Sequence, residues 1–120
     1  MLHKMRLKSE EFYNIKYNNK IMEVRLNDEK RKKIKVGDKI IFYRLPELGE
    51  FIFVTVEEIY KFMTFKQLYN MFPLHYFGYN NQNINEILNR IYSIYSPEQE
   101  EKNGVIAIKF KVEDIKASHQ

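Results

Sequence analysis

Three side chains near the start of the chain, Lys20, Glu23 and Arg25, have types and spacing that suit ion binding or proton transfer. They lie at or within the segment IMEVRLN (21–27), whose alternation of apolar and polar residues predicts a half-buried strand. Glu23 and Arg25 then share one face of this strand, roughly 7 Å apart, and can form an ion pair. Lys20 has the opposite parity, but a bend at the strand start would turn it toward the same face.

These three residues allow two interpretations. A buried lysine with a lowered pKa can act as a base or bind phosphate. A surface salt bridge between Glu23 and Arg25 would contribute well under about 1 kcal/mol and perform no chemistry. Spacing alone favours the salt bridge. The sequence has no nucleophile–base signature and no glycine-rich phosphate loop.

A dense basic cluster follows the strand, comprising Lys30, Arg31, Lys32, Lys33 and Lys35. From position 20 to position 39 there are eight Lys and Arg against four Asp and Glu, which accounts for the whole net charge of +4. Such a cluster can neutralise several phosphates and give an affinity that falls with salt. A solvated turn, partly offset by the neighbouring carboxylates, explains it equally well.

The segment 60–80 contains eight Phe and Tyr. Those between positions 65 and 72 have helical spacing and indicate core packing. Tyr76, Phe77 and Tyr79 lie in a loop and cannot all be buried cheaply, so they predict either a platform on which unpaired bases stack or an apolar patch for a protein partner.

The periodicities predict strands at 3–7, 21–27, 39–45, 51–60 and 105–112. They predict helices from Ser9, over about 65–72, and from Asn83 along an apolar stripe to Tyr95, with a loop at 73–82 and a polar loop at 97–104. The absence of regular strand–helix alternation argues against a doubly wound sheet. We expect an α+β fold: a small, mostly antiparallel β-barrel with two or three helices packed on it, as a single domain over residues 1–120.

The chain has no cysteine, and His3, His75 and His119 are far apart in the sequence. We therefore expect no disulfide, no metal and no cofactor. The apolar runs are too short to span a membrane, and the first residues lack the apolar core of a signal peptide. The sequence thus predicts a soluble, cytoplasmic protein with no membrane partner.

Three stretches, KIMEVRLNDEKR (20–31), IKVGD (34–38) and IIF (40–42), together resemble the ASCH (ASC-1 homology) domain. The hallmark of that family is a K-x-x-E-x-R strand, then a basic turn and a Gly-Asp pair before the next strand. The segments 95–96 and 104–109 resemble its closing loop and strand. The resemblance implies a PUA-like β-barrel with an RNA-binding cleft lined by Lys20, Glu23 and Arg25, whose positive rim Lys30 to Lys35 would extend.

One branch of the family hydrolyses the amide of N4-acetylcytidine with a lysine, a threonine and a glutamate. The lysine matches Lys20, the threonine position is Glu23, and the glutamate falls near Asn80. Lys20 and Glu23 thus become candidate catalytic residues of an amidohydrolase acting on modified nucleosides, or of a ribonuclease as reported for a few relatives. Because two of the three roles are altered, we predict binding of RNA or a nucleoside-like ligand first, with Tyr76 and Tyr79 among the contacts, and leave catalysis open.

Overall fold

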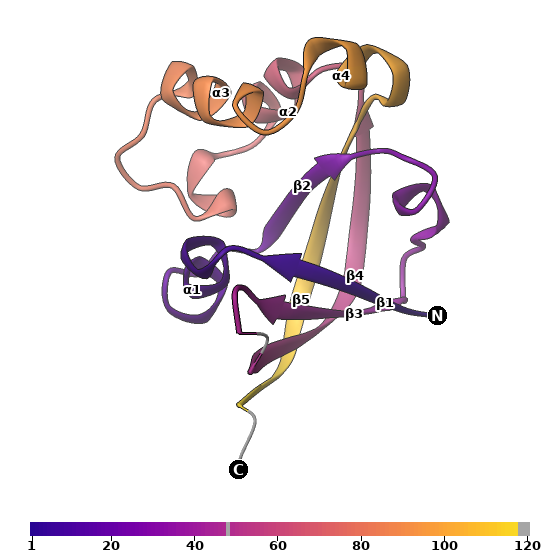
Figure 1. Ribbon diagram of the computed structural model, residues 1–120, viewed down its shortest axis with the longest axis vertical. Coiled ribbons are helices and arrows are strands. Elements are labelled where there is room, and N and C mark those ends of the chain that lie inside the picture. The colour runs from indigo at the N-terminus through magenta and orange to yellow at the C-terminus, as the bar shows by residue number, and fades with distance from the viewer. Residues whose placement is uncertain (48, 118–120) are drawn as a thin grey trace.

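The computed structural model describes residues 1–47 and 49–117. Its strands are β1 (Leu2–Leu7), β2 (Met22–Leu26), β3 (Lys39–Arg44), β4 (Glu50–Phe62) and β5 (Val105–Ala117). Its helices are α1 (Ser9–Tyr17), α2 (Phe65–Met71), α3 (Ile84–Tyr92) and α4 (Pro97–Asn103), with 3₁₀ turns η1 (Arg31–Lys33) and η2 (Leu74–Phe77). Figure 1 shows α2, α3 and α4 gathered beyond one end of the long strands β4 and β5.

The strands form one sheet in the order β1-β3-β4-β5-β2. Strand β1 is parallel to β3, and the other three neighbouring pairs are antiparallel. The expected α+β class is confirmed, but the closed barrel is wrong: β1 and β2, the two edges of the described sheet, form no ladder with each other. We call the gap between them the seam. It is crossed by a side chain instead, since Nη2 of Arg25 donates to the carbonyl oxygen of Arg6 at 2.8 Å.

Apolar side chains fill both faces of the sheet around β5. A first core cluster joins β1, β3, β4, β5 and α1, and a second joins β2 and β5 to α2, α3 and η2. Ile106, Ile108 and Phe110 are buried in the first cluster, as their alternation predicts. Val112 has the same parity along β5 but is 37% exposed, because β5 there has passed beyond its pairing with β2.

Within the described residues there are four helices instead of the two or three expected, and the difference is α4, in a segment expected to be a loop. Its sequence has no apolar stripe, so its ends define it. Ser96 and Gln99 form a reciprocal capping box, Pro97 occupies the first turn, and Gly104 ends the helix at a φ of +67°. No helix in the described part of the chain is long and apolar enough to cross a membrane.

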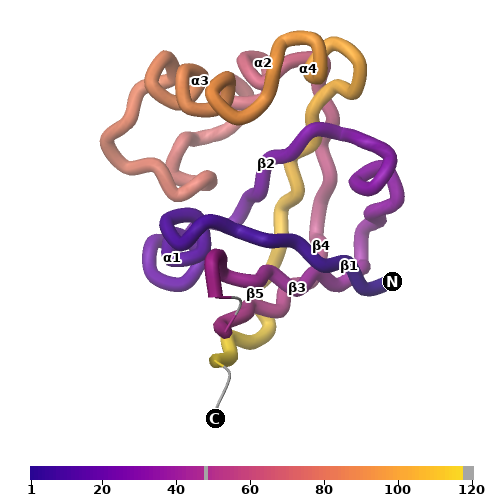
Figure 2. Tube along the Cα trace, viewed as in Figure 1, coloured from indigo at the N-terminus to yellow at the C-terminus, as the bar shows by residue number. Residues whose placement is uncertain are grey.

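The aromatic loop at 73–82 is more ordered and more buried than expected. It contains η2, and Phe77 and Tyr79 are only 2% and 7% exposed. Their rings pack against Tyr69 with centroids 4.8 and 6.5 Å apart. Gly78 makes this possible because its φ of +87° turns the chain sharply between them. Figure 2 shows this segment running beside the connection from α1 into β2.

Candidate functional site

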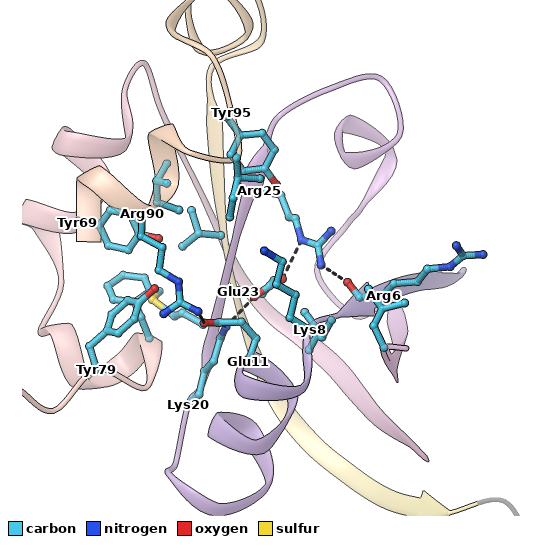
Figure 3. A pocket seen from close by; sticks show the side chains of 17 residues that line it. Arg6, Lys8, Glu11, Lys20, Glu23, Arg25, Tyr69, Tyr79, Arg90 and Tyr95 are labelled. Carbon is cyan, nitrogen blue, oxygen red and sulfur yellow. Dashed lines mark hydrogen bonds and ion pairs between the residues drawn. The ribbon is translucent and has the colours of Figure 1, made fainter. Parts of the chain in front are cut away.

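A cavity of about 210 Å³ opens at the seam. Helices α1 and α3, together with the segment that follows η2, complete its walls (Figure 3). Five cations and two carboxylates line it, which gives the lining an excess of positive charge: Arg6, Lys8, Lys20, Arg25 and Arg90 against Glu11 and Glu23. Its aromatic lining is Tyr69, Phe77, Tyr79 and Tyr95.

Strand β2 positions two of the charged groups. Glu23 pairs with Ile108 and Arg25 with Ile106 across the β2–β5 ladder, and residues directly opposite one another point to the same face of a sheet. Both isoleucines belong to the first core cluster. Because β1 does not close over this end of the face, Glu23 and Arg25 meet the cavity, with Oε2 of Glu23 2.8 Å from Nε of Arg25.

Lys20 reaches the same place through a bend before β2. Asn19 adopts a φ of +56°, and the amide of Lys20 donates to the carbonyl of Asn14 in α1 at 3.1 Å. Nζ of Lys20 then lies 2.8 Å from Oε1 of Glu23 and also donates to Oε2 of Glu11. The expected bend is therefore present, and Lys20, only 4% exposed, shares the cavity with its two carboxylate partners.

The cavity charges form a row of alternating sign. The order is Arg90, Glu11, Lys20, Glu23, Arg25, with Nη2 of Arg90 3.6 Å from Oε1 of Glu11 at its start. Arg90 comes from α3, Glu11 from α1, and the last two from β2. Since every buried charge in the row touches a charge of opposite sign, the row also ties these three elements together.

Neighbouring charges override burial in setting the ionisation of this row. Burial alone would lower the pKa of Lys20 and raise that of Glu23, because it penalises charged forms. Glu23 and Glu11 outweigh this effect and raise the pKa of Lys20. Lys20 and Arg25 likewise outweigh it at Glu23 and lower the pKa of Glu23 to about 2. Both groups are therefore charged at neutral pH.

Three tyrosines present hydroxyls to the cavity without a protein partner. Tyr60 and Tyr92 bond to glutamates, whereas among the described residues no group bonds the hydroxyls of Tyr69, Tyr79 and Tyr95. Figure 3 shows these hydroxyls directed toward the charged row. Burial raises the pKa of all three, so each remains a neutral donor and acceptor. None of the three hydroxyl oxygens is among the buried atoms that lack a partner, so each is open to the cavity, where a ligand or water can bond it.

The carboxylates of the cavity are arranged for ion pairs rather than for metal coordination. Within residues 1–47 and 49–117, no three His, Cys, Asp or Glu side chains come close enough to hold a metal ion. His3 bonds Asp38 at 2.8 Å, which lowers the pKa of Asp38. His119 lies outside the described residues.

The family model of the ASCH domain matches residues 5–114 of the chain. The chain belongs to the ASCH domain family. Because the match covers Lys20, strand β2 with Glu23 and Arg25, and most of the closing strand β5, the family resemblance seen in the sequence is confirmed. No curated protein matches this ASCH chain.

Solved structures agree with the fold of this ASCH chain. The crystal structure of hypothetical protein PH0355 is 32% identical, with a TM-score of 0.83 over 94% of this chain and 100% of that one. The solution structure of protein PF0455 from Pyrococcus furiosus is also 32% identical, with a TM-score of 0.72 over 93% and 97%. ASCH from Zymomonas mobilis is more distant, at 16% identity and a TM-score of 0.43 over 90% and 65%.

The ASCH cavity includes only some of the residues singled out in the sequence. Lys20, Glu23, Arg25 and Tyr79 line it. The basic turn, Lys30, Arg31, Lys32, Lys33 and Lys35, does not, and two of its cations are occupied locally by Asp28 and Glu29 at 3.3 and 3.4 Å. Tyr76 is half-buried against the second core cluster and is also outside the lining.

Sequence reasoning missed several residues that line the ASCH cavity: Arg6, Lys8, Glu11, Arg90, Tyr69 and Tyr95. Glu11 looks like an ordinary acidic residue in the first turn of a helix, and Tyr69 like an ordinary core residue. Their shared role arises from packing between elements far apart in the chain. The only local signal was the apolar stripe of α3, which fixes the face on which Ile91 and its neighbour Arg90 approach the cavity.

Proposed function

We propose that this ASCH domain binds RNA by holding one unpaired base, with its sugar, in the cavity at the seam. The cavity volume of about 210 Å³ lies below the roughly 300–1,000 Å³ typical of sites for drug-sized ligands. It therefore suits a single nucleoside better than a paired segment. Sequence-specific RNA recognition commonly takes unstacked bases into such sites and stacks them on aromatic rings.

The observation that carries the proposal is the set of hydroxyls of Tyr69, Tyr79 and Tyr95, which have no protein partner and lie beside a row of charges of alternating sign. The edge of a nucleobase offers both donors and acceptors, which neutral hydroxyls can meet in either role. The excess of cations in the lining favours an anionic ligand such as a phosphodiester. Membership of a family generally proposed to bind RNA supports the same conclusion.

The ionisation of the row favours binding over hydrolysis. A general base that works at neutral pH needs a pKa near 7. The pKa of Lys20 is raised and that of Glu23 is lowered to about 2, so neither is poised to accept a proton. Asn80, where the resemblance places a third catalytic group, is exposed and outside the cavity lining. Lys20 and Glu23 serve better as a fixed electrostatic frame.

The proposal is tested by titrating fluorescein-labelled RNA 12-mers of random sequence at low salt and following anisotropy. The Tyr79→Phe and Tyr95→Phe variants remove one hydroxyl each and keep the ring. Each should weaken binding about 5- to 10-fold, because a hydrogen bond contributes about 1–1.4 kcal/mol. Tyr17→Phe, at an exposed position outside the cavity, is the matched control and should bind like the unchanged protein. Equal binding by all of these variants would refute a role for the cavity.

A further inference from the structure

Three exposed cations, which we call the β1 cations, lie along β1 and directly after it. Met5 and Leu7 point into the first core cluster. The alternate residues Lys4 and Arg6, and Lys8 directly after the strand, therefore face outward, and all three are exposed. Neighbouring β1 cations are about 7 Å apart, a spacing that an extended polyanion can follow.

The β1 cations begin at the cavity. Lys8 and Arg6 belong to the cavity lining, and Lys4 lies one step farther along the same face. Figure 3 shows Lys8 beside the cavity and the side chain of Arg6 directed away from it along β1. A ligand that leaves the cavity on this side meets the β1 cations at once.

The β1 cations have no carboxylate partner to offset their charge. Elsewhere in the sheet Arg44 pairs with Glu50 at 3.1 Å, and Arg31 of the basic turn pairs with Asp28. Across residues 1–47 and 49–117, no carboxylate comes within ion-pair distance of the β1 cations. Adjacent positive charges without counter-charges create a local potential that attracts a polyanion.

Aromatic side chains lie on the same outer face of the sheet, beside the β1 cations. Arg6 is opposite Tyr43 across the β1–β3 ladder, and Tyr43 is opposite Phe51 across the β3–β4 ladder. Phe53 lies two residues farther along β4. The three rings are half-buried, with centroids 5.9 Å apart for Tyr43 and Phe51 and 5.5 Å apart for Phe51 and Phe53. Aromatic rings next to cations are the surface on which bases of single strands stack.

We propose that this outer face is a track for the nucleotides that flank the base in the cavity. The track consists of Lys4, Arg6 and Lys8, which face phosphates, and Tyr43, Phe51 and Phe53, on which bases stack. The inference rests on the proposed function, and it names the partner as single-stranded RNA. An acidic peptide would match the cations but not the aromatic rings.

The test compares random RNA 4-mers, which fill little more than the cavity, with random 12-mers, which reach the track. Two variants address its two parts: Lys4→Gln with Arg6→Gln, and Tyr43→Leu with Phe51→Leu. The first should lower the salt slope of 12-mer binding by about 1.4, at about 0.7 per phosphate contact. The second should leave the slope unchanged and weaken 12-mer binding at least about 5-fold. Because longer strands offer more binding registers, the quantity compared between proteins is the ratio of 12-mer to 4-mer affinity.

Lys30→Gln with Lys33→Gln removes the same charge from the basic turn and is the control, expected to keep the unchanged ratio. If the control lowers the ratio as much as the track variants do, or if no variant lowers it, the track is refuted while the cavity proposal stands. Displacement of RNA by poly-glutamate of equal charge as readily as by unlabelled RNA would also refute it. Binding of neither RNA length by the unchanged protein would refute both proposals. The Lys4 and Arg6 side chains are exposed, so that variant remains decisive even if the aromatic variant does not fold.

Discussion

Lys20 has two carboxylate partners, and one of them, Glu23, has a second cation in Arg25. Removing charges from water is costly, and the cost is recovered only when each charge has close partners of opposite sign. The row at the seam meets this condition at every buried member. Its groups are therefore fixed in place before any ligand arrives, which limits the ordering that binding would require.

Glu23 should make the protein sensitive to acid. Its pKa in the folded state is about 2, against an ordinary value of 4.5. Its contribution, on the order of 3 kcal/mol, is thus fully present above about pH 5 and is lost as the pH falls toward 2. Urea unfolding at several pH values between 2.5 and 7 measures this loss.

In the Glu23→Gln variant the free energy of unfolding at pH 7 should be about 3–5 kcal/mol lower, because Lys20 and Arg25 lose a partner. Plotted against pH, this free energy should also fall less steeply with acid than in the unchanged protein. Glu57→Gln, at an exposed position, is the control and should follow the unchanged protein. Parallel curves for Glu23→Gln and the unchanged protein would show that Glu23 has an ordinary pKa.

At the scale of elements, the cavity depends on a close approach between η2 and α1 at Gly78. A Cβ at this position would lie 2.8 Å from Cβ of Asn14, well inside van der Waals contact. The residue also has a φ of +87°, which side chains other than glycine rarely adopt. Two separate costs therefore oppose any substitution there.

Gly78→Ala should destabilise the protein by about 1–2 kcal/mol from the backbone and by about 1–3 kcal/mol more from the clash. Gly37→Ala isolates the first cost, because Gly37 has a φ of +92° but no atom within 4 Å of its added Cβ. The difference in the free energy of unfolding between the two variants, from urea titrations, measures the clash. Equal destabilisation would mean that η2 and α1 do not touch at Gly78.

Elements with a strong period could be predicted from sequence. The alternation of β2 and the apolar stripe of α3 each record which face is buried. Helix α4 could not, since its residues are polar on all sides and only its caps mark its ends. The burial of Phe77 and Tyr79 was missed because it depends on the turn at Gly78 and on Tyr69, in another element.

The candidate site divides in the same way. The meeting of Lys20, Glu23 and Arg25 is local, but spacing alone favoured a surface salt bridge, and it was the family resemblance that placed the three residues in one cleft. Glu11 and Arg90 are far apart in the sequence and meet only after α1 and α3 have packed. Charge density in the sequence pointed to the basic turn at 30–35, whereas the structure leaves that turn outside the cavity lining.

At the scale of the whole molecule, the seam is the feature that sequence patterns could not reveal. They identify strands but not which edges pair, so a closed barrel and an open sheet look alike. Arg25 reaches across the seam to the carbonyl of Arg6, while its Nε holds Glu23. One side chain thus connects the two free edges of the sheet.

Arg25→Lys should loosen the seam without unfolding the protein. Lysine keeps the charge beside Glu23 but lacks the planar fork that donates to two acceptors at once. We expect amide hydrogen exchange in β1 to rise about 10-fold, the effect of losing about 1.5 kcal/mol from a charged hydrogen bond. Exchange at the centres of β4 and β5, measured in the same NMR experiment, serves as the internal control. A uniform rise in all strands would indicate general destabilisation, and no change in β1 would mean that the bond does not hold the seam.

An open sheet exposes strand edges that can recruit a second sheet, which is a common route to aggregation. In this chain the outward positions of β1 are Lys4 and Arg6, and Lys8 follows them. Two copies that approached edge to edge through β1 would bring like charges together and repel each other. The side chains that we assign to RNA would then also keep neighbouring molecules apart when no RNA is bound.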